Sequence, residues 1–512
     1  MPAELELRRA VALAPRGGAA GRRADVVLLP ASEASAALAF ARARELVGER
    51  RGGITLAGAE RSLEAHFLPQ SGAGPNAVVS SKRLRGRVEV LGTSPSEDGA
   101  MLRVRALAGT SFGELCRAVQ ATGAEFMPFS APTAEAISLG GALAVNAHAR
   151  ASSTHGGLFA KHVRSFRLVD PSGRVHECRS DADGELEREL YRSVPGALGS
   201  LGLVTELELE LRPVSPRAEV VVEVLERSVG DPAPAVRSYL ARVADERRDG
   251  FRRWSEGLGL VFLGVPGRGA CVVLGRRLGG RVEPRRSTLP LFRESAESNL
   301  FVQAFSHRYP GIARSLAAQL LRPGRSFRAP YYRWTFFQTS YDECAARVER
   351  RKPVHFELFG LGDGFGLVHQ AWVVASSALA AFVALAAEVF ARPEYEPVAD
   401  ALELLDALPL PAPTTPLEPS RCVGGDAHVV TANVAVRTPS ERELAVALCR
   451  ELSERAHEGG LPVVVQLNKQ HHVAEAVLRT MHRAALDDLE RVRARVDGDG
   501  VLGSETLQRL GI

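Results

Sequence analysis

Twenty residues in the first third of the chain bring glycine pairs together with small polar side chains. The run 138–157, SLGGALAVNAHARASSTHGG, has a glycine pair near each end, with Asn146 and His148 between the pairs. Glycine permits positive φ and leaves backbone N–H groups unshielded, so a diphosphate can accept several hydrogen bonds from such a segment. The run predicts a loop that holds a phosphate-bearing ligand; the alternative is a small-residue turn that packs between sheet layers.

A lysine near the C-terminus is the second candidate for chemistry. The chain has only four lysines, and Lys469 directly follows the predicted strand VVVQLN. A lysine that burial removes from water has a lowered pKa and can accept the proton of a substrate hydroxyl. The alternative is a solvated lysine at a strand end. His471 and His472 follow, and they either reach the same pocket or lie on the surface where a helix starts.

Composition limits the classes of protein to which this chain can belong. Hydrophobic residues make up 45% of the 512 residues and charged residues 24%, which is typical of globular proteins and argues against a disordered or fibrous chain. The net charge of +4 is small for this length and gives no reason to expect nucleic acid as a partner. We expect a soluble protein of two domains, monomeric or homodimeric, that acts on a small molecule.

The cysteines and the N-terminus bear on location. Six cysteines lie far apart without CxxC spacing, which predicts neither a disulfide framework nor a metal site. The first residues lack the apolar core of a signal peptide, and no apolar run reaches the ~18 residues of a membrane span. We therefore expect a cytoplasmic protein without an integral membrane segment.

Alternating strand and helix patterns open the chain and must position the glycine-rich run. Residues 25–46 predict a strand, a turn and an amphipathic helix, and further strands are predicted at 52–58, 76–81 and 101–109. Residues 111–124 predict a helix whose capping box consists of Ser111 and Glu114. A hairpin is predicted at 163–178, and the strict alternation of LVTELELELRPV at 203–214 predicts a half-buried strand.

A second domain is predicted after residue 214, because strands and helices continue beyond two prolines there. Strands are expected at 259–265 and 271–277, a helix at 396–408, and a proline-rich connector up to 419. A strand at 428–436, a helix at 441–460, a strand at 461–469 and a helix at 474–496 complete the pattern.

Several segments together resemble the vanillyl-alcohol-oxidase and p-cresol-methylhydroxylase superfamily of FAD-binding oxidoreductases. Residues 137–178 are similar to the decaprenylphosphoryl-β-D-ribose 2-oxidase-like branch, as are 28–43, 58–62, 107–133 and 197–213 in the same order. The similarity covers the first 214 residues and the ending 486–512, whereas 215–455 is only faintly similar. Asp499 stands where this branch usually has proline, and Leu502 where it has an aromatic residue.

The resemblance implies an α+β fold with a two-subdomain FAD-binding domain at 1–214. It also implies a cap or substrate domain with an antiparallel sheet at 215–455 and a C-terminal segment, 456–512, that returns to the flavin. Two loops, 58–63 and 138–148, would grip the FAD diphosphate. The implied cofactor-binding residues are Gly58, Ala59, Glu60, Arg61, Ser62, Leu63, Thr133, Ser138, Leu139, Gly140, Gly141, Val145, Asn146, His148, Ser152, Gly156, Leu203, Val204 and Gln466.

The mode of FAD attachment follows from one position of the first loop. Some members of the superfamily bind FAD covalently through a histidine there, and the matching residue in this sequence is Arg61. The resemblance therefore implies noncovalent FAD. His66 lies five residues further on and could be the covalent anchor only if the loop were shifted; otherwise it is expected to be an ordinary surface histidine.

The implied catalytic residues are Lys469, Gln370 and His148. Lys469 matches the lysine beside the flavin ring, and Gln370 lies in a segment similar to a cap strand that faces the substrate, with His369 as the alternative in a one-residue ambiguity. An ordinary sheet strand is the other interpretation of that segment. His148 would line the flavin pocket, or would be a core histidine. Thr431 and Asn433 stand near the position of this branch's reactive cysteine, which leaves the substrate open.

These residues favour an FAD-dependent oxidoreductase that oxidises a secondary alcohol on a sugar-like or other hydroxylated small molecule, in a biosynthetic pathway. A base for the hydroxyl proton and a flavin that accepts the hydride are what this reaction needs. The sequence leaves two alternatives open. One is a reductase of carbon–carbon double bonds that uses NAD(P)H, and the other is a degenerate FAD-binding protein without activity.

Overall fold

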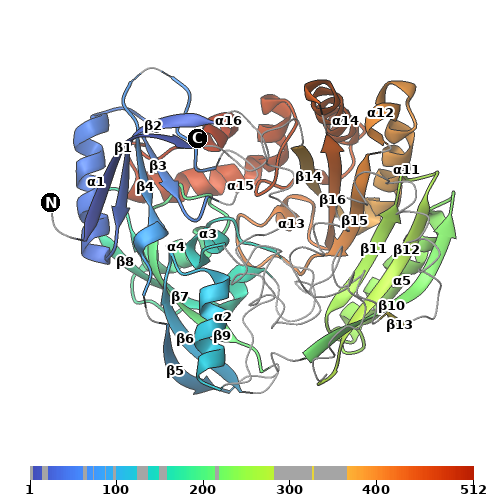
Figure 1. The fold of residues 1–512 in the computed structure, drawn as a ribbon, viewed down its shortest axis with the longest axis horizontal. Helices are drawn as coiled ribbons and strands as arrows, with labels where there is room; N and C mark the ends of the chain where they lie inside the picture. The colour runs from blue at the N-terminus through green and yellow to red at the C-terminus, as the bar shows by residue number, and fades with distance from the viewer. Residues whose placement is uncertain are drawn as a thin grey trace, which may run out of the picture.

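The computed structural model is a mixed α+β structure with two small sheets on one side and a large sheet on the other (Figure 1). It describes residues 4–13, 21–60, 66–72, 74–86, 88–95, 100–123, 137–148, 158–213, 218–281, 326–327, 366–399, 401–436 and 438–512.

The first sheet has four strands in the order β1-β2-β4-β3. Helix α1 (Glu33–Val47) connects β2 to β3 and starts at a capping box of Ser32 and Ser35. The predicted strand–helix–strand order is confirmed, and β2, β3 and β4 run parallel. Strand β1, which no sequence pattern predicted, adds antiparallel to β2. The strands are β1 (Leu5–Leu13), β2 (Arg22–Pro30), β3 (Ile54–Ala57) and β4 (Ala77–Ser80).

The second sheet is antiparallel, with the strand order β5-β6-β9-β7-β8. The predicted hairpin is β7 and β8, and the predicted alternating strand is β9, which buries every second residue. The predicted capping box of Ser111 and Glu114 is confirmed at the start of α2. The elements are β5 (Glu89–Ser94), β6 (Met101–Leu107), β7 (Val163–Val169), β8 (Val175–Arg179), β9 (Leu203–Leu211), α2 (Phe112–Ala121), α3 (Leu139–Ala144), α4 (Glu185–Ser193), η1 (Ser81–Arg83) and η2 (Phe159–His162).

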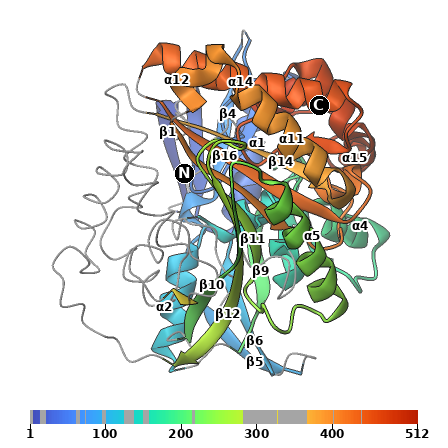
Figure 2. The same cartoon turned by 90° about the vertical axis from the view of Figure 1, so that its right-hand side faces the viewer.

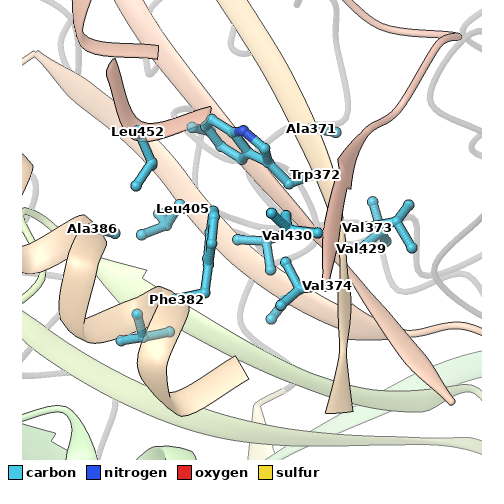
Figure 3. Close-up of a cluster of buried hydrophobic side chains, with 14 of the residues drawn as sticks. Ala371, Trp372, Val373, Val374, Phe382, Ala386, Leu405, Val429, Val430 and Leu452 are labelled. Atoms are coloured by element: carbon cyan, nitrogen blue, oxygen red, sulfur yellow. The ribbon is translucent and has the colours of Figure 1, made fainter. Parts of the chain in front are cut away.

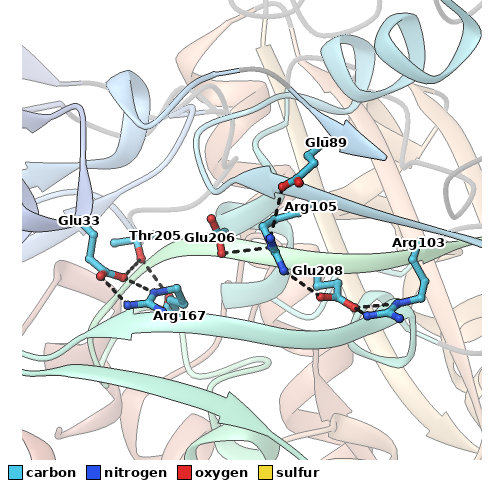
Figure 4. Close-up of polar contacts among 8 residues, drawn as sticks. All are labelled: Glu33, Glu89, Arg103, Arg105, Arg167, Thr205, Glu206 and Glu208. Carbon is cyan, nitrogen blue, oxygen red and sulfur yellow. Dashed lines mark hydrogen bonds and ion pairs between the residues drawn. The ribbon is translucent and has the colours of Figure 1, made fainter. Parts of the chain in front are cut away.

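One face of the second sheet carries a ladder of arginine and glutamate side chains (Figure 4). Arg105 lies within 3.6 Å of both Glu206 and Glu208, and Arg103 donates to Glu208 at 2.9 Å. At one end of the ladder, Arg167 binds Glu33 of α1 through two hydrogen bonds of 2.6 and 2.7 Å. This bidentate pair joins the first sheet's helix to the second sheet. Partly exposed ion pairs such as those of the ladder each contribute only ~0–1 kcal/mol.

The third sheet has eight antiparallel strands in the order β13-β10-β12-β11-β15-β16-β14-β17. It confirms the antiparallel sheet expected in the second half of the chain. The strands are β10 (Ala218–Val229), β11 (Gly257–Leu263), β12 (Ala270–Arg281), β13 (Ser326–Phe327), β14 (Gly366–Ala375), β15 (Leu402–Pro409), β16 (Ala427–Val436) and β17 (Val463–Val465).

The helix predicted at 396–408 is wrong over most of its length. Only α12 (Glu396–Ala399) is helical, and β15 then pairs with β11 on one side and with β16 on the other. Leucine is a strong helix former in isolation, but in this interior strand the side chains of Leu402, Leu405 and Leu408 are buried. Tertiary packing overrides the local preference.

Helices cover one face of the large sheet (Figure 2). The core between them contains Trp372 of β14, Leu405 of β15 and Phe382 of α11 (Figure 3). The helices that follow the sheet strands are α5 (Ala233–Arg248), η4 (Ser376–Ala378), α11 (Leu379–Phe390), η5 (Pro393–Tyr395), α13 (Pro419–Cys422), α14 (Pro439–Glu458), α15 (Glu475–Val496) and α16 (Glu505–Leu510).

The C-terminal residues pack against the first two sheets. Leu489, Val492 and Val496 of α15 belong to the core of the second sheet, and Leu502 forms a parallel bridge with Ile54 of β3. A buried bidentate ion pair between Arg212 and Glu256 joins the end of β9 to the start of β11. The domain boundaries near 214 and 455 stay predictions.

Two consecutive apolar helices are together long and apolar enough for a membrane span, but they do not form one straight helix. Among the described residues no single helix is long and apolar enough to cross a membrane; Ser376–Phe390 and Pro393–Ala399 reach that composition only together, and they are bent by 77°.

Candidate functional site

The two loops expected to bind the diphosphate lie against each other. Gly58 directly follows β3, and a Cβ on Gly58 would lie 2.8 Å from Ser138 Oγ, the N-cap of α3. A Cβ on Gly141 would lie 2.9 Å from the same oxygen. Real Cβ atoms do not approach this closely, so both glycines are needed for the contact. The described parts of the loops, 58–60 and 138–148, are thus held side by side.

The first glycine pair lies in a short helix and not in the expected open turn. The N–H of Leu139 donates to Thr110 O at 2.9 Å, and that of Gly140 to Ala108 O at 2.8 Å. Ser138 Oγ accepts from Gly141 N at 3.4 Å. The expectation that these N–H groups are unshielded is therefore wrong. Gly140 instead permits α3 to pack on the backbone of Ala108, which is the packing alternative.

Asn146 is held by contacts within the protein. Its φ of 42° is positive, its Oδ1 accepts from Ala160 N at 3.1 Å, and its Nδ2 donates to Glu418 Oε1 at 3.2 Å. Glu418 also accepts from the N–H and the hydroxyl of Thr414. Burial raises the pKa of the Glu418 carboxyl, and these hydrogen bonds, which lower the pKa, offset only part of that rise. Asn146 thus fixes the loop after α3 to the segment 414–418.

Gln466 and His148, both predicted site residues, are brought together. Gln466 Nε2 lies 3.1 Å from His148 Nδ1, and Gln466 N donates to Ala371 O of β14 at 2.8 Å. The buried acceptors Gln466 Oε1 and Asn468 Oδ1 have no hydrogen-bond partner in the part of the chain that the structure describes. Two acceptors of this kind, at the junction of the first two sheets with the third, suit a ligand that donates hydrogen bonds.

Lys469 lies at this junction and is partly buried. Its N–H donates to Gln466 O at 3.2 Å, which closes a tight turn after β17. Desolvation lowers the pKa of its ammonium to about 8, and the negative charge of Asp406 opposes the shift. Asp406 is a buried residue of β15, and sequence reasoning missed it because it fell inside a predicted helix. An acid–base group with a pKa near neutrality is the chemically notable feature here.

The face of the large sheet opposite its helices carries a polar group of residues. Asp406 pairs with Thr431, and His369 pairs with Asn433, in adjacent rows of β15, β16 and β14. Directly paired residues, and residues two apart, project from the same face, so these four share one face. The imidazole Nδ1 of His369 is hydrogen-bonded to Asn433 Oδ1.

Gln370 projects from the other face of β14 and not toward these residues. Its Nε2 donates to Ser453 Oγ of α14 at 2.7 Å, and its Oε1 accepts from His472 N at 2.8 Å. The expectation that Gln370 faces the substrate does not agree with this geometry. His369, the alternative in the register ambiguity, lies on the polar face.

Two histidines are buried: His66, which was expected on the surface, and His471, for which the surface was one of two alternatives. His66 and His471 are 7% and 1% exposed, and their ring centroids lie 6.3 Å apart. Helix α16 contacts both segments: Glu505 N donates to Leu68 O at 3.0 Å, and an Arg509 guanidinium nitrogen lies 2.9 Å from His471 Nδ1.

Some of the remaining predicted residues lie in the described part of the chain, and the others lie outside it. Leu203 packs in the core beside α1, Val204 in the core beside α3, and Val145 lies between that core and the large sheet's core. Ala59 adjoins Glu60, which has positive φ and an ion pair with Lys82 at 2.6 Å. Outside the described residues lie Arg61, Ser62, Leu63, Thr133, Ser152 and Gly156.

Comparison with known proteins identifies the segment that forms most of the first two sheets. A model of the FAD binding domain family matches residues 24–179, which span β2 to β8. These residues form an FAD-binding domain. No curated protein matches the sequence. The domain implies FAD as the cofactor and suggests a flavin-dependent oxidoreductase, and the buried acceptors of Gln466 and Asn468 fit the hydrogen-bond donor of a flavin ring.

Proposed function

We propose that this FAD-binding protein oxidises a secondary alcohol of a sugar-like or other hydroxylated small molecule to a carbonyl. The observation that carries the proposal is Lys469, whose pKa of about 8 makes it a base near neutral pH. It follows Gln466, which contacts His148 of the FAD-binding domain. The chemistry that a bound flavin supplies is acceptance of a hydride at N5.

Lys469 has the properties needed to take up the hydroxyl proton. In its neutral form, Nζ accepts the hydroxyl proton while the carbon gives its hydride to the flavin, so the alcohol loses two protons and two electrons in total and becomes a carbonyl. The negative charge of Asp406 favours the ammonium that forms, because opposite charges attract strongly where water is excluded. Asp406 also keeps the lysine pKa from falling so far that the base would be too weak.

The polar face of the sheet supports a hydroxylated substrate. Thr431, Asn433 and His369 offer hydroxyl, amide and imidazole groups in adjacent rows beside Asp406. Such groups can bind the hydroxyls of a substrate through directional hydrogen bonds. This favours a sugar-like substrate, which is also the class that the resemblance to the decaprenylphosphoryl-β-D-ribose 2-oxidase-like branch suggests.

We further propose that FAD is bound noncovalently, because Arg61 stands where a covalent histidine would be required. Acid precipitation of the purified protein should leave all flavin absorbance in the supernatant. Yellow colour that stays in the washed pellet would contradict this attachment and would direct attention to His66.

Anaerobic bleaching of the bound flavin tests the reaction. A panel of sugars, sugar phosphates and polyols should contain compounds that bleach the absorbance of the wild-type flavin. Lys469→Ala should keep the absorbance and lose the bleaching, whereas Lys161→Ala, at an exposed position, should bleach like the wild type. Bleaching by NADPH alone would favour a double-bond reductase, and a protein that remains colourless with added FAD would contradict both enzymes.

A further inference from the structure

Helix α16 contacts two segments that are far apart in the sequence. The N–H of Glu505 donates to Leu68 O at 3.0 Å, and Gln508 Oε1 accepts from Ser71 N at 3.1 Å. These bonds hold residues 66–72, which follow the first FAD loop. Helix α16 also contacts the segment that contains Lys469, through a hydrogen bond between Arg509 and His471.

Arg509 makes three hydrogen bonds to that segment. One guanidinium nitrogen lies 2.9 Å from His471 Nδ1, and the other donates to His471 O at 3.1 Å and to Val473 O at 3.2 Å. A guanidinium only donates, so Nδ1 must be the acceptor and the ring proton must be on Nε2. Burial lowers the pKa of His471 well below its usual value, and the charges of Arg509, His472 and His482 add to this, so the ring stays neutral.

The segment is also held at its other end and along its length. His482 of α15 binds Val465 O through Nε2 at 2.8 Å. His369 N donates to Gln470 Oε1 at 2.6 Å. Residues 465–473 are therefore fastened to β14, α15 and α16, and Lys469 lies between these points.

We propose that Arg509 is a positioning residue that fixes Lys469 in place by holding His471 and Val473, so that α16 sets the geometry of the reaction. The inference rests on the proposed role of Lys469. Arg509 does this through a planar fork that binds a ring nitrogen and two carbonyls at once, which no other side chain can reproduce. A precise position of the base matters because a displacement of about 1 Å can cost ~100-fold in rate.

The scarcity of lysine makes the position of Lys469 directly measurable. Reductive methylation with ¹³C-formaldehyde would label four lysines and the N-terminus, and Lys469→Arg would assign the Lys469 signal. Arg509→Met in the FAD-loaded protein should shift this signal and its titration midpoint, because the lysine would move relative to Asp406 and to the fixed charges of the segment. The rate of flavin reduction should fall by on the order of tenfold or more, with the flavin absorbance retained.

Arg479→Met is the matched control. Arg479 of α15 donates to Arg509 O at 3.0 Å and to Gln508 O at 3.4 Å, and its ion pair is with Glu475, so its polar contacts hold the same helix and do not involve residues 466–473. This variant should leave the Lys469 signal and the rate of reduction unchanged. Equal effects of the two substitutions would overturn the proposal, since they would show that α16 acts only through general stability.

The NMR signal separates this proposal from the proposed function. An unshifted Lys469 signal in Arg509→Met overturns the positioning role whether or not any alcohol bleaches the flavin. A shifted signal supports it even if no tested alcohol does so. If Arg509→Met fails to fold, Arg509→Gln, which keeps one donor group, is measured with the same expected shift and the same overturning result.

Discussion

Gln466 Nε2 lies 3.1 Å from His148 Nδ1, so a residue after β17 contacts the loop after α3. This hydrogen bond links the large sheet to the FAD-binding domain. It places the buried acceptor Gln466 Oε1 beside the domain that the cofactor requires.

Gln466→Met should weaken FAD binding. The substitution removes the bond to His148 and the acceptor that suits a flavin donor, and one such hydrogen bond is worth about 1.4 kcal/mol, or roughly tenfold in affinity. Fluorescence titration of the apoprotein with FAD measures the change. Gln120→Met, on α2, should bind FAD like the wild type, and equal affinities of all three proteins would contradict the assigned role of Gln466.

The rate of flavin reduction should depend on the protonation of Lys469. Only the neutral amine accepts a proton, so the rate should rise with pH below the lysine pKa of about 8 and level off above it. The rise should be about tenfold per pH unit well below that value. Stopped-flow measurement from pH 6 to pH 10 tests this, and a flat profile in the wild type would exclude Lys469 as the base.

Gly140→Ala should destabilise the FAD-binding domain. The added Cβ would lie 2.9 Å from Ala108 Cβ and 3.2 Å from Ala108 O, and the backbone there cannot move aside easily. Overpacking of this kind costs about 1–3 kcal/mol. Denaturant unfolding measures the loss. Gly86→Ala is the control, because its Cβ would meet only the flexible end of Leu107 at 3.3 Å; a cost as large at Gly86 would contradict the argument.

His176 should give the protein a stability maximum in weakly acidic solution. Its ring is buried 2.9 Å from Asp170 and 3.1 Å from Glu187; burial opposes its charge, but the two carboxylates prevail and raise its pKa. The pKa of each carboxyl is lowered: at Asp170 the hydrogen bonds to His176 and Ser172 outweigh burial, and at Glu187 the bond to His176 dominates.

The sign of the effect differs for the two kinds of group. The stabilisation from His176 is complete below the unfolded histidine pKa and is lost as pH rises through its raised folded pKa. The stabilisation from the carboxylates is present above their unfolded pKa values and is lost as pH falls. His176→Gln should cost about 2 kcal/mol near pH 6 and flatten the pH dependence of unfolding. An unchanged pH profile in this variant would refute the assignment.

The ion pair between Arg212 and Glu256 should be costly to break on one side only. Both residues are buried, with N–O distances of 2.8 and 3.2 Å. Glu256→Gln should destabilise the protein by about 3–5 kcal/mol, because it leaves a buried guanidinium without its counter-charge. The double variant Arg212→Met with Glu256→Met should be more stable than the single one. Urea unfolding decides this, and a less stable double variant would contradict it.

Much of the fold could be predicted from local patterns. The capping box at Ser111, the hairpin of β7 and β8 and the alternation of β9 are encoded within a few residues, and the structure has each of them. Strand β15 was not predictable in the same way, because its leucines suit a helix until β11 and β16 provide partners. Strand β1 likewise depends on its pairing with β2.

The candidate site was less accessible to sequence reasoning. Lys469 stood out through its rarity and its place after an apolar strand. Asp406 and Arg509 did not, because their contacts with the Lys469 segment join residues that are distant in the chain. Burial of His471 has the same origin. Gln370 and His369 are neighbours on β14 and project from opposite faces of the sheet. The sequence does not show which of them lies on the polar face, because this depends on the pairing of β14 with β16.

The bridge between Ile54 and Leu502 has a consequence for how the protein can be divided and how it folds. A recombinant fragment limited to the FAD-binding segment would lack this partner of β3 and the α15 side chains of the second sheet's core, so we expect it to aggregate. The bridge closes a loop that contains the whole chain between Ile54 and Leu502, and contacts between residues so distant in sequence form slowly compared with local pairing. Cofactor uptake should therefore be among the last events of folding.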